Sequence, residues 1–239
     1  GSTCTFGGTV ASGISPDGGN ATIFIGKDRN GVFGNPILRT GSIGGGATSA
    51  TGGKIGSAII DISGGDVQAQ FVLAASDNNE FNMSGGTIRN SYSTDSDYKH
   101  IKLYGGAVYM EQGNFTMSGG TIQNCSAQLG GAVYLKGSSG TTFTMSGGTI
   151  KDCISETHGG AVYLEQGNVI LTGGTIFNKL ARIGDGGGIY VLGGNLSIPA
   201  GSTVSIEENA AYSRNASGCG SGGGIYVTSE KADLEVDIL

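Results

Sequence analysis

Three charged residues at matching positions of a repeat are the strongest candidates for chemistry: Glu111, Lys136 and Glu165. A polysaccharide lyase needs acidic side chains gathered around Ca²⁺ and a lysine or arginine base on the same face. Here the signs alternate along the row, which is typical of charge pairing on a solvated sheet. Related hydrolases use paired aspartates with a His-Gly, and the chain has His158-Gly159 but no Asp-Asp pair. We therefore predict no catalytic residues and no cofactor.

The four cysteines offer a disulfide rather than a metal site. No Cys-x-x-Cys spacing is present, so we predict no metal ligands. Cys125 and Cys153 occupy the same slot of neighbouring repeats, where Cα atoms about 5 Å apart are within disulfide range. Side chains stacked in parallel reach the required dihedral awkwardly, so both the bonded and the free state stay open. Cys4 and Cys219 are expected near opposite ends, where they cannot pair.

Two long insertions are the first candidates for a binding site. They span Ser91–Tyr104 and Ala210–Ser221, and both leave the repeat at the same slot. Insertions on one face of a repeat structure often form its binding side. The first insertion combines aromatic and charged residues, which are Tyr92, Asp95, Asp97, Tyr98, Lys99, His100 and Tyr104.

A row of tyrosines is the alternative binding surface. The row is Tyr109, Tyr134, Tyr163, Tyr190 and Tyr226, all at one outward position. A stacked, exposed aromatic ladder can bind a glycan or a partner protein. It can equally shield the sheet or lie under a loop.

Two recurring phrases define the elements that position these residues. Gly-Gly-Ala-Val-Tyr begins at 105, 130 and 159 and becomes Gly-Gly-Gly-Ile-Tyr at 186 and 222, with spacings of 25, 29, 27 and 36 residues. Met-Ser-Gly-Gly-Thr-Ile alternates with it, at 83–88, 117–122 and 145–150. Each phrase alternates apolar and polar residues, the period of a half-buried strand.

A single repeat buries too few apolar side chains to fold alone, so successive repeats must stack as coils. We predict burial of Val133, Leu135, Phe143, Met145 and Ile150, with Tyr134, Lys136, Thr144 and Ser146 outside the coil. Asn90, Asn124, Asp152 and Asn178 form a polar row that we place, facing inward, at a turn. The predicted fold is all-β, a right-handed, single-stranded parallel β-helix with three strands per coil of about 27 residues.

Composition limits the organisation and the partners. Residues 1–239 are predicted to form one domain, in which 1–80 are degenerate N-terminal coils or a cap and 81–239 are regular coils. We expect a piece of a longer protein, because the chain starts Gly1-Ser2 and stops within a strand-like pattern. The 13 Lys and Arg residues are outnumbered by 19 Asp and Glu residues and form no cluster, which argues against nucleic acid as a partner. No apolar run is long enough to insert into a membrane.

The phrases Ile122-Gln123-Asn124 and Gly130-Gly131-Ala132-Val133-Tyr134 resemble the repeats of polymorphic outer-membrane proteins, which are autotransporter passengers. They also resemble repeats of adhesin-like surface proteins from gut-dwelling bacteria and archaea. One phrase departs, since Ile-x-Asn stands where the outer-membrane family has Phe-x-x-Asn. The resemblance implies an extracellular, secreted or surface-attached β-helix, an adhesin or stalk that contacts a host glycan or extracellular protein. The alternative is a polysaccharide-active enzyme or a glycan-binding module on the same fold.

Overall fold

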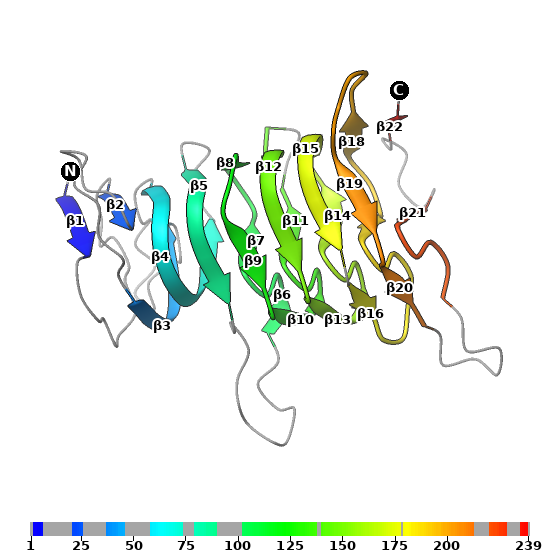
Figure 1. Cartoon of the computed structure of the whole chain (residues 1–239), viewed down its shortest axis with the longest axis horizontal. Helices are drawn as coiled ribbons and strands as arrows, with labels where there is room; N and C mark the ends of the chain where they lie inside the picture. The colour runs from blue at the N-terminus through cyan, green and yellow to red at the C-terminus, as the bar shows by residue number, and fades with distance from the viewer. Residues whose placement is uncertain are drawn as a thin grey trace.

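The chain folds as a parallel β-helix, seen in a computed structural model as a row of stacked coils from β1 near one end to β22 near the other (Figure 1). The structure describes residues 2–6, 21–25, 37–45, 58–73, 79–89, 102–137, 140–177, 179–212, 220–228 and 235–238. Every strand pair in this part of the chain is parallel, and no helix occurs in it. The β-helical fold class is thereby confirmed, while its right-handedness stays a prediction.

The strands of successive coils lie above one another in four columns. Column A contains β7 (Val108–Met110), β11 (Val133–Lys136), β14 (Val162–Gln166), β17 (Ile189–Val191) and β21 (Ile225–Val227). Column B contains β8 (Asn114–Met117), β18 (Asn195–Ile198), β22 (Glu235–Ile238) and the first halves of β5 (Glu80–Arg89), β12 (Thr142–Lys151) and β15 (Asn168–Phe177). Column C contains the second halves of β5, β12 and β15, together with β9 (Thr121–Gln123) and β19 (Ser205–Glu207).

Column D is a separate five-stranded sheet where we predicted only a variable connection. It contains β6 (Lys102–Tyr104), β10 (Ser126–Leu129), β13 (Ile154–His158), β16 (Leu180–Ala181) and β20 (Ala210–Ala211). The coils therefore have a fourth short strand beyond the three predicted. These strands have two to five residues and little alternation, so a sequence pattern cannot separate them from a loop.

The strands of the N-terminal region continue the same stack. They are β1 (Ser2–Phe6), β2 (Ala21–Ile25), β3 (Ile37–Gly45) and β4 (Ala58–Leu73). β1 pairs with β2, β2 with β4, and β4 with β5, which extends column B toward the N-terminus. β3 pairs with the later part of β4.

The predicted inward residues form the core. Val133, Leu135, Phe143, Met145 and Ile150 are all fully buried. Four phenylalanine rings stack along the core with centroid separations of 4.5 to 4.6 Å. They are Phe71, Phe81, Phe115 and Phe143. Outside the coil, Lys136 and Ser146 are exposed and Thr144 is half-buried, as expected.

The polar row marks the corner between columns C and D. Asn124 and Asp152 have left-handed backbone angles, with φ of 53° and 52°, a conformation that Asn and Asp tolerate better than most residues. Asn124 is exposed, so the predicted inward orientation of this row is wrong at that residue. The residue type at this corner is required by the backbone. Asn90 and Asn178 lie outside the described residues.

Candidate functional site

Most of the first predicted site lies outside the described residues. This applies to Tyr92, Asp95, Asp97, Tyr98, Lys99 and His100. Tyr104 is described, at the end of β6, and its side chain is 38% exposed. Its ring lies 4.6 Å from the ring of Tyr134 and 5.9 Å from that of Tyr109. Tyr104 thus joins the alternative site, the tyrosine row.

The tyrosine row is a continuous ring stack on column A, which we call the tyrosine ladder. The paired strands align Tyr109, Tyr134, Tyr163, Tyr190 and Tyr226 in one register. Successive ring centroids are 5.7, 5.2, 5.0 and 5.3 Å apart. The prediction that one row carries all five rings is therefore correct.

The prediction that this ladder is exposed is wrong for its centre. Tyr134 is 2% exposed, and Tyr163 and Tyr190 are each 7% exposed. Each ring covers the face of its neighbours, and the Gly-Gly corner brings the end of column D beside the ladder. That end carries Tyr104, Leu129 and His158 in one row, and the His158 ring lies 4.5 Å from that of Tyr190. The ladder is a second small core and offers no open ring faces at its centre.

The charged residues beside the tyrosine ladder, Glu111, Lys136 and Glu165, form hydrogen bonds or an ion pair with their neighbours. The hydroxyl of Tyr109 donates to Glu111, and that of Tyr134 donates to Glu165. Lys136 Nζ lies 3.4 Å from Glu111 Oε1. Glu111 and Glu165 therefore anchor hydroxyl groups of the ladder, and Lys136 pairs with Glu111.

Burial, followed by the hydrogen bond to a carboxylate, raises the pKa of Tyr109 and of Tyr134 well above the ordinary value. The contribution of a raised tyrosine pKa to the free energy of unfolding is fully present below the ordinary tyrosine pKa of about 10. It is lost as the pH rises above that pKa toward the raised one. We expect Tyr134 to ionise only as the chain unfolds in alkali. Comparing phenolate absorbance and far-UV circular dichroism during titration tests this. Tyr134→Phe is expected to lower the phenolate absorbance gained during unfolding and to leave the absorbance gained before unfolding unchanged. Early loss of absorbance in Tyr134→Phe would contradict the assignment.

Cys125 and Cys153, the possible disulfide, are not bonded to each other, and both thiols are buried. Each donates to the carbonyl two residues earlier, at 3.3 and 3.2 Å, and burial raises the pKa of Cys153 well above its usual value. Lys179 occupies the equivalent position in the next coil and is 2% exposed. Its Nζ donates to the carbonyl two residues earlier at 2.8 Å. Burial lowers the pKa of Lys179 to about 8. The slot thus satisfies backbone carbonyls at the corner between columns C and D.

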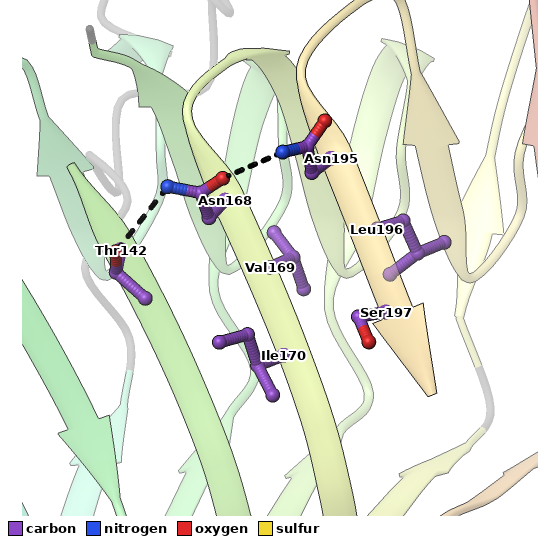
Figure 2. Close-up of a pocket in the computed structure, with 7 residues that line it drawn as sticks. All are labelled: Thr142, Asn168, Val169, Ile170, Asn195, Leu196 and Ser197. Atoms are coloured by element: carbon purple, nitrogen blue, oxygen red, sulfur yellow. Dashed lines mark hydrogen bonds between the residues drawn. The ribbon is translucent and has the colours of Figure 1, made fainter. Parts of the chain in front are cut away.

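A groove lies on the outer face of column B. It crosses β12, β15 and β18 and has a volume of about 260 Å³. Figure 2 shows its lining as two rows of side chains, with Thr142, Asn168 and Asn195 in one and Ile170 and Ser197 in the other. Val169 and Leu196 lie between the rows, and both are buried in the core. No ionisable side chain lines the groove.

The first row is joined by hydrogen bonds between side chains. Asn195 Nδ2 donates to Asn168 Oδ1 at 3.1 Å, and Asn168 Nδ2 donates to Thr142 Oγ1 at 3.5 Å (Figure 2). Parallel strands stack these residues about 4.8 Å apart, which is the spacing that an amide ladder needs. This amide ladder, formed by Thr142, Asn168 and Asn195, holds the two amide groups in one orientation along the stack.

Sequence reasoning missed this groove. Its signal was the recurrence of Asn at the first outward position of column B, in Asn114, Asn168 and Asn195. Isolated asparagines in a strand resemble surface residues until the register shows that they align.

Within the described residues, no group of three His, Cys, Asp or Glu side chains is arranged to hold a metal ion. The same part of the chain contains no helix long and apolar enough to cross a membrane. Comparison with models of protein families, with curated proteins and with solved structures found no match to the chain.

Proposed function

We propose that the chain is a non-enzymatic, extracellular β-helical surface domain, an adhesin or stalk that contacts a host glycan or an extracellular protein. The observation that carries this proposal is the groove on column B, which is preformed and lined only by amide, hydroxyl and aliphatic side chains. Such a lining can bind a ligand but contains no group able to accept or donate a proton in glycosidic cleavage.

Four acidic side chains in or beside the strands have structural partners. Asp66 forms an ion pair with Arg89, whose Nε lies 2.7 Å from Asp66 Oδ1. Glu156 pairs with Arg182 at 3.5 Å. Glu165 accepts from Tyr134 of the neighbouring coil, and Glu111 accepts from Tyr109 of its own coil and pairs with Lys136 of the next. These contacts support a structural role for the four acids.

The competing function is a polysaccharide-active enzyme on the same fold. Incubating the purified chain with pectins, alginates and host glycans, followed by product analysis by chromatography, separates the two. We expect no oligosaccharide release above that of a boiled sample. Release that disappears in Glu111→Gln or Glu165→Gln, while a Glu156→Gln control keeps it, would establish an enzyme and overturn the proposal.

A further inference from the structure

The outer face of column B differs in charge from the neighbouring face of column C. Column C aligns Arg89, Gln123 and Lys151 in one outward row. The groove on column B has no charged lining residue, and its rows continue across β8 with the exposed Asn114 and Thr116. The next residues in these rows are acidic: Glu80 aligns with Asn114, Glu235 with Asn195 and Asp237 with Ser197. A ligand in this groove meets hydrogen-bonding groups and no cation, which favours an uncharged ligand over an anionic one.

We propose that this groove binds an uncharged glycan chain that lies along the stack of coils. The inference rests on the proposed binding function and names its ligand class and site. Sugar hydroxyls both donate and accept hydrogen bonds, as do the side chains of Asn195, Ser197 and Thr142. An anionic glycan would lose its hydration here without meeting a cation.

The amide ladder preorganises the groove for such a ligand. An asparagine amide has two N–H donors and two acceptor lone pairs, and the bond from Asn195 to Asn168 uses one donor of Asn195. Because the neighbouring side chain already fixes the amide plane, little side-chain entropy remains to be lost on binding. Ile170 supplies an aliphatic surface in the second row, against which the C–H face of a sugar ring can pack.

The size of the groove favours a chain over a compact ligand. Its volume of about 260 Å³ is below the roughly 300–1,000 Å³ that is usual for small-molecule sites. Equivalent side chains recur about every 4.8 Å along the stack. Asn114 in the first row, and Thr116 and Thr144 in the second, therefore extend the same chemistry beyond the hollow. A glycan chain can collect contacts over several coils, each too weak to hold a single sugar.

Affinity electrophoresis in gels that contain a polysaccharide tests this inference. The neutral probes are galactomannan, mixed-linkage β-glucan and xyloglucan, and the anionic probes are polygalacturonate and alginate. We expect at least one neutral probe to retard the chain and the anionic probes to leave its mobility unchanged. Ser197→Arg, which fills the groove without touching the amide ladder, and Asn195→Leu are each expected to weaken retardation at least tenfold. Gln123→Leu on column C is the matched control and is expected to keep it.

The outcomes separate this inference from the proposed function. Retardation by a neutral probe that survives both groove variants would overturn the site while leaving a binding domain. Binding to extracellular proteins with no retardation by any neutral polysaccharide would overturn the ligand class alone. Cleavage of a probe would overturn the proposed function as well. Circular dichroism of each variant excludes unfolding as the cause of a loss.

Discussion

Replacing Gly131 by alanine is expected to destabilise the chain by about 3 kcal/mol or more, because the added methyl group has no room. A Cβ atom built at Gly131 would lie 2.2 Å from the carbonyl oxygen of Gly160 in the next coil and 2.7 Å from the backbone of Ile154. Both obstacles are main-chain atoms of the stack, so relief requires the coils to separate. Urea unfolding followed by circular dichroism measures the loss.

Gly224→Ala is the matched control for this substitution. Gly224 belongs to the same recurring phrase, but its nearest neighbour to an added Cβ is the Ile206 side chain at 3.7 Å, an ordinary contact. Its position corresponds to Ala132 in the coil of Gly131, so alanine is already accepted there. We expect a change below about 1 kcal/mol. Equal effects of the two substitutions would mean that the coils do not stack in the described register.

Phe143→Ala is expected to cost about 3–5 kcal/mol, because it removes a fully buried ring from the stacked column and leaves a cavity. The neighbouring ring of Phe115, at 4.6 Å, loses one of its two stacking partners in the same step and keeps Phe81. Each coil contacts only its neighbours, so the loss should be largest around β8, β12 and β15. Hydrogen exchange monitored by mass spectrometry locates it.

Phe177→Ala removes the same ring from the outside of β15 and serves as the control. Phe177 is half-buried and lies outside the stacked column, so we expect less than about 1 kcal/mol. If Phe177→Ala proved as costly as Phe143→Ala, the assignment of inner and outer faces in columns B and C would be inverted.

The core could be predicted from the sequence because a strand has a period of two. Val133 and Leu135 alternate with Tyr134 and Lys136, and one charged residue is enough to identify the outer side. The repeated phrases then identify which residues of other coils stack on Val133. From residue 81 onward, these two local signals determine the register of columns A, B and C.

The rest depends on how columns meet, which no local pattern encodes. The burial of Tyr134 follows from the approach of Tyr104, from another coil, and of column D at the Gly-Gly corner. The thiols of Cys125 and Cys153 donate to backbone carbonyls at the corner, contacts that depend on the backbone conformation there. The groove could not be predicted because it depends on the alignment of Asn168 with Asn195, and each asparagine alone resembles an ordinary surface residue.

Nuclear magnetic resonance of the ¹⁵N-labelled chain, titrated with short fragments of the neutral polysaccharide that retards it best, tests the central claim most directly. The side-chain NH₂ signals of Asn168 and Asn195 are resolved from backbone amides and report on the groove itself. We predict that these signals and the backbone amides of β12, β15 and β18 shift together in a saturable manner. Shifts confined to the tyrosine ladder or to column C, with both asparagine side chains unchanged, would contradict binding in the groove.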